Sequence, residues 1–182
     1  MTRLKQPVSA DDHVQGSADA LTTLVEYGDY ECPHCAHAYP IVKQLQKRFG
    51  DDLRFVFRNF PLNEAHPNAE AAAETAEFAG AHGKFWEMHD LLFENQPRLG
   101  TALFVELAQK LKLPRPALEA ALEGGQFAAR VRADFSGGVR SGVNGTPTFF
   151  INGLRYDDSW EFPELLLVID QAIESARNPA AD

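Results

Sequence analysis

The sequence predicts an α/β fold in which a mixed central sheet has helices on both sides and is interrupted by an all-helical subdomain. Three observations support this class. A strand, a helix and a strand follow one another between residues 21 and 60, as in a right-handed βαβ unit. Helical periodicity then fills residues 67–140. A strand, an Asn152-Gly153 turn and a return strand lead into a last helix, which completes a ββα unit.

The βαβ unit is predicted from composition and helix signals. Residues 21–27 (LTTLVEY) and 52–60 (DLRFVFRNF) are rich in apolar and β-forming residues, as expected of strands covered on both faces. Apolar residues at helical spacing predict a helix over 33–49. Pro33 suits its first position because proline has no N–H to lose, and Gly50 suits its end.

The chain divides into four parts within one domain. Residues 1–20 are polar and predict an N-terminal arm with at most a short edge strand. The helical insertion is predicted to end with a long helix whose apolar face carries Phe127, Val131, Phe135 and Val139. The predicted parts are the arm at 1–20, the βαβ half at 21–64, the helical insertion at 65–141 and the ββα half at 142–178.

Composition restricts the class of protein. The 182 residues are 45% apolar and 24% charged, which is typical of a soluble globular domain. A net charge of -9 argues against a nucleic-acid partner and against an anionic membrane surface. No stretch approaches the roughly 20 apolar residues of a membrane span. The N-terminus lacks the apolar core of a signal peptide, so we expect a cytoplasmic protein, or a periplasmic one if a leader has been removed. We also expect a monomer or a weak dimer.

The chain contains two cysteines, and both lie at the start of the predicted helix as Cys32 and Cys35. A Cys-x-x-Cys pair can close and reopen a small disulfide. Unpaired N–H groups and the helix dipole favour an anion at this end of a helix, which lowers the pKa of a cysteine there. We therefore predict that Cys32 is an accessible nucleophile and that Cys35, one turn deeper, resolves the mixed disulfide.

Two other interpretations of these cysteines are weighed against exchange. The first is that both are inert core residues, which a proline at a helix start argues against. A zinc site would use Cys32, His34, Cys35 and His37, but residues so close in one helix cannot all converge on one tetrahedral ion, and no second cysteine pair is present. We expect no metal, and no cofactor beyond the Cys32–Cys35 disulfide itself.

The motif Cys32-Pro33-His34-Cys35 after a strand, together with the segment 142–153 (GVNGTPTFFING), resembles the DsbA-like branch of the thioredoxin superfamily. Between them, residues 83–89 (GKFWEMH) resemble the helical insertion of its shorter members. The resemblance implies a thioredoxin fold and a cis peptide at Thr146–Pro147 beside the disulfide. It also implies that the backbone at Thr146 binds an extended substrate chain.

Two ionisable residues are predicted to tune the cysteines. An imidazolium at His34 would favour the Cys32 thiolate. Glu26, inside a strand covered on both faces, is costly to bury unless it is paired or functional. The resemblance implies that Glu26 relays a proton to or from the resolving thiol, and it leaves open whether Arg54 or Arg58 pairs with it. The other five histidines are interpreted as surface or capping residues.

The predicted function is that of a thiol–disulfide oxidoreductase. It would exchange disulfides with protein or small-molecule thiols through the pair Cys32–Cys35, with no nucleic acid and no membrane as partner. The alternative is a redox-sensing or binding module with the same fold and no turnover. Turnover in an insulin-reduction assay distinguishes the two, because a sensor cycles once.

Overall fold

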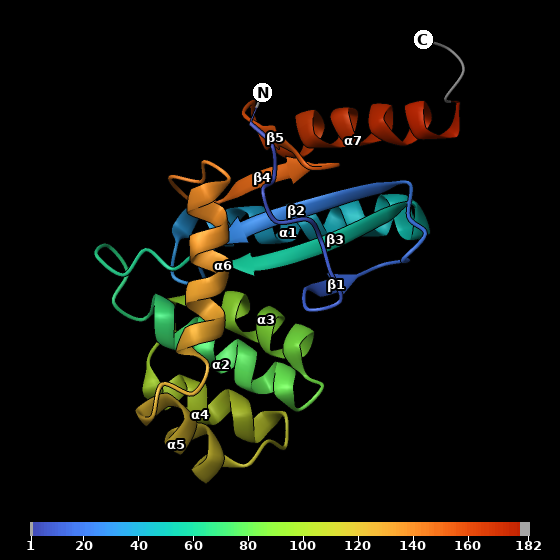
Figure 1. Cartoon of the computed structure of the whole chain (residues 1–182). Coiled ribbons are helices and arrows are strands. Elements are labelled where there is room, and N and C mark those ends of the chain that lie inside the picture. The colour runs from blue at the N-terminus through green and yellow to red at the C-terminus, as the bar shows by residue number, and fades with distance from the viewer. Residues whose placement is uncertain (1, 179–182) are drawn as a thin grey trace.

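A mixed five-stranded sheet forms the centre of the computed structural model, which describes residues 2–178 (Figure 1). Its strands are β1 (His13–Gln15), β2 (Thr22–Gly28), β3 (Leu53–Asn59), β4 (Thr148–Ile151) and β5 (Leu154–Tyr156), in the spatial order β1-β3-β2-β4-β5. Strands β2 and β3 are parallel, and the other neighbours are antiparallel. The predicted α/β class and mixed sheet are confirmed.

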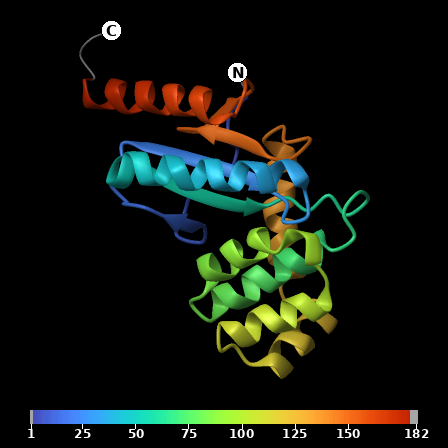
Figure 2. The same cartoon turned by 180° about the vertical axis from the view of Figure 1, so that it is seen from behind.

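Helices cover both faces of this sheet (Figures 1 and 2). Helices α1 (Pro33–Phe49) and α7 (Phe162–Arg177) pack on one face, where their apolar residues join the main core. Helix α6 (Ala128–Arg140) packs on the other face with the N-terminal arm. The sequence patterns predicted α1 at the residues where the structure has it.

Strand β2 is the central strand and carries Glu26. This residue is opposite Phe57 of β3 in the parallel ladder and opposite Phe149 of β4 in the antiparallel one. Side chains alternate between the two faces of a strand, so Glu26 and its neighbour Tyr27 lie on opposite faces of the sheet. The residue after β2, Asp29, begins the turn that enters α1.

The helical insertion lies beyond the β1 edge of the sheet, and α6 runs back from it across the sheet (Figure 1). Its other helices are α2 (Ala69–Ala81), α3 (Phe85–Glu94), the 3-10 helix η2 (Gln96–Arg98), α4 (Thr101–Lys110) and α5 (Arg115–Glu123). A second 3-10 helix, η1 (Gly50–Asp52), follows α1.

None of the helices described in residues 2–178 combines the length and apolar character needed to cross a bilayer.

One predicted core position is wrong. Val139 was expected on the apolar face of the last insertion helix, but it is 53% exposed. The glycines before it explain the difference. A Cβ on Gly138 would lie 2.7 Å from the ring of Phe60 and 3.0 Å from the ring of Tyr27, so α6 turns its glycine face toward the sheet. Val139 then points outward.

The N-terminal arm is attached to the sheet by Arg58 of β3, which is buried. Its guanidinium donates to both carboxylate oxygens of Asp12 at 2.8 and 2.9 Å, to the carbonyls of Gln6 and Pro7, and to the hydroxyl of Tyr27. The arm also supplies β1, which pairs antiparallel with β3. Residue 1 of the predicted arm lies outside the described residues.

Candidate active site

The turn from β2 into α1 places both cysteines at the start of the helix. Cys32 is the N-cap residue, with extended φ and ψ of -71° and 124°, and Pro33 follows in the first helical turn. Cys35 lies one turn into α1, and both cysteines are free thiols. The side chain of Cys32 therefore stands over the N–H groups that an α-helix leaves unpaired at its N-terminus.

The surroundings of the Cys32 sulfur favour the thiolate. Hydrogen bonding from the Cys35 thiol is the largest cause, and the Thr146 hydroxyl and the backbone N–H groups of Cys35 and His34 add to it. Burial opposes these effects, but the net result lowers the pKa of Cys32 to about 5. At neutral pH the group is thus a thiolate, which is the nucleophile of disulfide exchange.

Cys32 is less accessible than predicted. It is 4% exposed, against 0% for Cys35, so the expectation of an open nucleophile is wrong. The loop before β4 accounts for this, because the sulfur of Cys32 lies 3.4 Å from the carbonyl oxygen of Thr146.

Cys35 has the opposite environment. Burial is the main cause that raises its pKa well above the ordinary value, and its hydrogen bond to Cys32 and the nearby charges of Glu26 and Cys32 act in the same direction. Its sulfur accepts a bond from the backbone N–H of Asp29 at 3.4 Å. The two cysteines are therefore separated into a thiolate and a protonated thiol.

Glu26 lies beneath the cysteines, 3% exposed, and its Oε1 has no hydrogen-bond partner within residues 2–178. Burial, and secondarily the charge of Cys32, raises its pKa to about 8. Neither arginine pairs with it, because Arg54 donates to the Thr23 hydroxyl and Arg58 is occupied by the N-terminal arm. Glu26 is thus an uncharged acid at neutral pH with a proton to exchange.

The loop before β4 completes the site. The peptide bond between Thr146 and Pro147 is cis, and both residues are half-buried. The Thr146 hydroxyl is buried and has no fixed partner among the described residues, which leaves it available to the thiolate. Gly142, at the start of this loop, has a φ of +80°, which glycine adopts without strain.

One histidine agrees with its predicted place and another does not. The side chain of His34 is exposed beside the site, and its backbone N–H is among the groups that lower the pKa of Cys32, while a role for its ring stays a prediction. His89 was expected to be a surface or capping residue but is 3% exposed, and its Nδ1 lies 3.0 Å from the hydroxyl of Tyr30. Burial lowers its pKa well below the ordinary value, so it is neutral.

No group of three or more His, Cys, Asp or Glu side chains within residues 2–178 is arranged to hold a metal ion. His34 and His37 are both exposed. His37 instead lies 3.1 Å from Glu161, which precedes α7. The four residues considered for zinc therefore do not converge.

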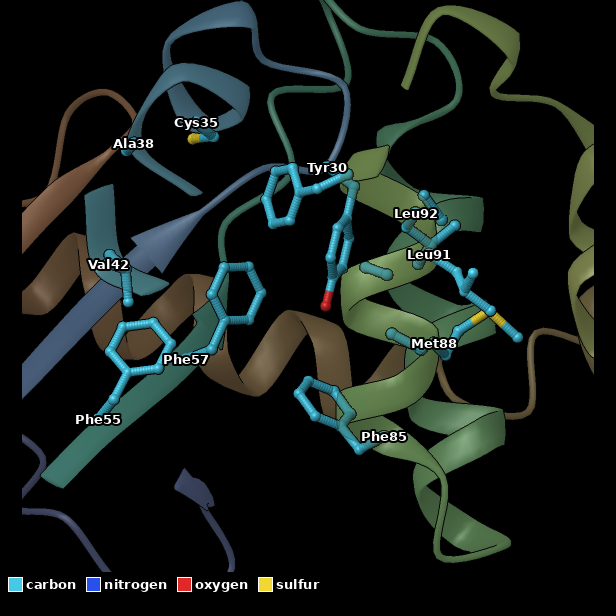
Figure 3. Close-up of a cluster of buried hydrophobic side chains, with 14 of the residues drawn as sticks. Tyr30, Cys35, Ala38, Val42, Phe55, Phe57, Phe85, Met88, Leu91 and Leu92 are labelled. Carbon is cyan, nitrogen blue, oxygen red and sulfur yellow. The ribbon is translucent and has the colours of Figure 1, made fainter. Parts of the chain in front are cut away.

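Sequence reasoning missed the residues that hold the turn at 29–32 against the insertion. Tyr30 lies between Phe57 of β3 and helix α3 (Figure 3). The carboxylate of Asp29 is fully buried and accepts bonds from the backbone of Leu62 at 2.9 Å and from His66 at 2.7 Å. Two further contacts are made by Glu31, which binds the backbone and side chain of Asn68, and by Gln96, which donates to Tyr30 and Cys32.

A hint of these contacts is present in the sequence, because Asp29 and Glu31 are two acids that flank a tyrosine next to a CxxC motif. Their partners are Leu62, His66 and Asn68, and only the tertiary fold brings these residues to the turn. Periodicity within one segment of the sequence cannot show which acid binds a backbone N–H of a distant segment.

Comparison with known proteins agrees with this geometry. The family model described as Thioredoxin matches residues 9–171. The chain is 42% identical over 175 residues to the Na(+)/H(+) antiporter NhaA 1 of Salinispora arenicola. The matched region covers 96% of this chain and 27% of that protein. The corresponding protein of Herminiimonas arsenicoxydans is 37% identical over 175 residues, with 28% of its length covered. The chain thus spans about a quarter of the length of these curated relatives.

Solved structures share the whole architecture. BdbD from Bacillus subtilis, in its oxidised form, is 27% identical with a TM-score of 0.85, over 95% of this chain and 98% of that one. The α-DsbA1 protein of Wolbachia pipientis is 18% identical with a TM-score of 0.82 over 96% of each chain, which shows the common fold. The chain therefore belongs to the thioredoxin family.

Proposed function

We propose that this domain exchanges disulfides with protein or small-molecule thiols through a mixed disulfide at Cys32. The observation that carries the proposal is the separation of roles at the start of α1. A low-pKa sulfur faces the loop of Thr146 and Pro147, while a protonated thiol and an uncharged acid lie beneath it.

The reaction follows from these protonation states. When a substrate disulfide arrives, the Cys32 thiolate attacks one sulfur, and the other sulfur leaves as a thiolate. Once Cys32 is part of the mixed disulfide, its charge no longer opposes ionisation of Glu26. The carboxylate form of Glu26 then takes the proton of Cys35, and Cys35 attacks the sulfur of Cys32 and expels the remaining substrate thiolate. In the opposite direction a substrate thiolate attacks the sulfur of Cys32, and Cys35 leaves and takes a proton from Glu26.

The backbone beside the cysteines would hold the substrate. We assign Thr146 and Pro147 to this role because the Thr146 carbonyl lies against the sulfur of Cys32. An extended chain aligned with this loop brings its own cysteine to Cys32 by strand addition. The half-buried position of both residues leaves one edge of the loop for such a chain.

The domain is expected to act as an oxidant. A stabilised Cys32 thiolate lowers the free energy of the reduced form, so the disulfide form tends to take electrons. The low pKa of Cys32 also makes it a good leaving group when a substrate breaks the mixed disulfide. A cytoplasmic location, a monomeric or weakly dimeric state and the physiological thiol partner stay predictions from the sequence.

Trapping tests the proposal. Cys35→Ser removes the resolving thiol, so covalent adducts through Cys32 should accumulate in cells and appear on non-reducing electrophoresis of the tagged protein. Cys32→Ser is the matched control and should trap almost none. Equal trapping through either cysteine, or none through Cys32, contradicts a two-step exchange centre. Turnover of insulin disulfides by the wild-type protein, with dithiothreitol as reductant, separates a catalyst from a sensor that cycles once.

A further inference from the structure

Gln96, in η2 between helices α3 and α4 of the insertion, touches the backbone that carries the nucleophile. Its Nε2 lies 2.8 Å from the carbonyl oxygen of Tyr30 and 2.9 Å from the carbonyl oxygen of Cys32. Both acceptors are carbonyls, so the amide nitrogen must face them, and both of its hydrogens are used. One side chain of the insertion thus bridges two carbonyls of the turn that enters α1.

The carbonyl of Cys32 is a sensitive point in this turn. The next residue is Pro33, which has no N–H, so the peptide between them can be held by hydrogen bonds only through that carbonyl. It accepts from the backbone N–H of Ala36 at 3.1 Å as well as from Gln96. Together these bonds fix the rotation of the peptide that follows Cys32, and therefore its ψ angle.

The position of the sulfur depends on that angle. The N–H groups of His34 and Cys35 that stabilise the thiolate belong to the first turn of α1 and are fixed by the helix. The torsions that separate the sulfur of Cys32 from them are the ψ and χ1 angles of Cys32 and the dihedrals of Pro33. A bond that fixes ψ also keeps the negative ends of the two carbonyls directed at Gln96 and away from the sulfur.

We propose that Gln96 is a positioning residue for the nucleophile, through which the helical insertion holds the sulfur of Cys32 over the N–H groups of α1. The proposal rests on the proposed exchange at Cys32. Gln96 acts through the backbone of Cys32 and has no contact with substrate in this role.

Other contacts keep the turn attached when Gln96 is changed. Glu31 binds Asn68 at 2.6 and 2.9 Å, and the hydroxyl of Tyr30 binds His89. Loss of the two bonds of Gln96 should therefore loosen the rotation at Cys32 without detaching the insertion.

The test replaces Gln96 with methionine, which has similar length and no donor. The matched control is Asn95→Met in the neighbouring residue, because the Asn95 side chain is also half-buried and its amide donates to the carbonyl of Leu91 rather than to the turn. Two quantities are measured on each protein: ultraviolet thiolate absorbance of the reduced form across pH, and the equilibrium between its dithiol and disulfide forms in glutathione buffers.

Gln96→Met should raise the midpoint of the Cys32 titration by about one pH unit, because a net hydrogen bond and one unit of pKa are similar in free energy. The equilibrium should shift by about tenfold toward the disulfide form, since the thiolate that favours the dithiol is weakened. Asn95→Met should leave both quantities at the wild-type values. Gln96→Ala is a second variant without a donor. Thermal melts of both variants show whether a change in the titration or in the glutathione equilibrium follows from unfolding.

A melting temperature that falls in Gln96→Met while the titration and the glutathione equilibrium stay at wild-type values would make Gln96 merely structural and overturn the proposal. Equal shifts in Asn95→Met would do the same, because the effect would then belong to the end of α3. If Cys32 of the wild-type protein does not titrate below the ordinary pKa of a cysteine and the protein does not exchange disulfides with glutathione, the proposed function fails instead. That outcome does not depend on Gln96.

Discussion

The two faces of strand β2 differ in how their buried ionisable groups are partnered. On one face, Glu26 lies beneath the cysteines with an oxygen that has no partner among the described residues. On the other face, Tyr27 contacts Arg58, whose donors are all directed at acceptors in the arm and the sheet. The buried guanidinium of Arg58 is fully paired, as expected of a charge that serves stability, whereas the unpartnered oxygen of Glu26 is consistent with the proposed exchange of a proton.

The difference predicts opposite dependence on pH. Burial opposes ionisation of Asp12, but bonds from Arg58 and the backbone of Ser9 lower its pKa, so its stabilising effect is present above the ordinary value and is lost as pH falls through the lowered one. The pKa of Glu26 is raised to about 8, so its effect is complete below the ordinary value and is lost as pH rises through 8. The Asp12 face therefore weakens as pH falls into the acid range, and the Glu26 face weakens as pH rises from the ordinary pKa of a glutamic acid to about 8.

The largest effect is expected from breaking the paired face. Arg58→Met leaves the Asp12 carboxylate and two carbonyls of the arm without their donor, and should lower the free energy of unfolding by about 3–5 kcal/mol. Urea unfolding at pH 7 measures it. Arg54→Met is the matched control on the same strand, since Arg54 donates only to the hydroxyl of Thr23 among its described side-chain contacts and should cost about 1 kcal/mol. Equal losses would contradict the assignment of Arg58 as the anchor of the arm.

Glu26→Gln comes next, and its effect should grow as pH rises from the ordinary pKa of a glutamic acid to about 8. Unfolded wild-type protein loses the Glu26 proton at the ordinary pKa, whereas folded protein keeps it until about 8. The amide titrates in neither state, so the variant should gain several kcal/mol relative to wild type as pH rises from 5 to 9. Unfolding of the reduced proteins across this range measures it. Resolution by Cys35 at pH 7 should slow by about 10²-fold, because an amide exchanges no proton. A difference between the two proteins that does not vary with pH would mean that Glu26 is ionised or paired at neutral pH.

Close packing on the Tyr27 face gives a smaller effect. Gly138→Ala places a methyl group 2.7 Å from the ring of Phe60, so α6 must shift and stability should fall by about 1–3 kcal/mol despite the better helix propensity of alanine. Ser136→Ala in the same helix is exposed and is the control, with no loss expected. Thermal melts compare them, and a stable Gly138→Ala protein would show that α6 is free to move away from the sheet.

Removal of one hydroxyl on the paired face gives the smallest effect. Tyr27→Phe deletes a single bond to Arg58, 3.0 Å long, and leaves the ring in place, so we expect a loss of about 1 kcal/mol at pH 7 and an unchanged titration of Cys32. Urea unfolding and thiolate absorbance measure the two quantities. A shift of the Cys32 titration would show that the two faces of β2 are electrostatically coupled.

Local sequence determined much of this protein. Strand β2, helix α1 and the turn at Asn152 and Gly153 follow from β-forming runs, helical spacing and a dipeptide with positive φ at both residues, which are 49° and 78°. The same local signals predicted Cys32 as the nucleophile, because the unpaired N–H groups and the dipole at a helix start favour a thiolate there.

Tertiary structure decided everything that depends on two distant segments. The absence of a basic partner for Glu26 among residues 2–178 follows from the register, which puts Phe57 opposite it and sends Arg58 to the other face. His89 became a core residue because the insertion folds onto Tyr30, and Gln96 reached Cys32 for the same reason. Helix and strand periodicities report which face of an element is apolar, but which residues meet across elements is set by packing alone.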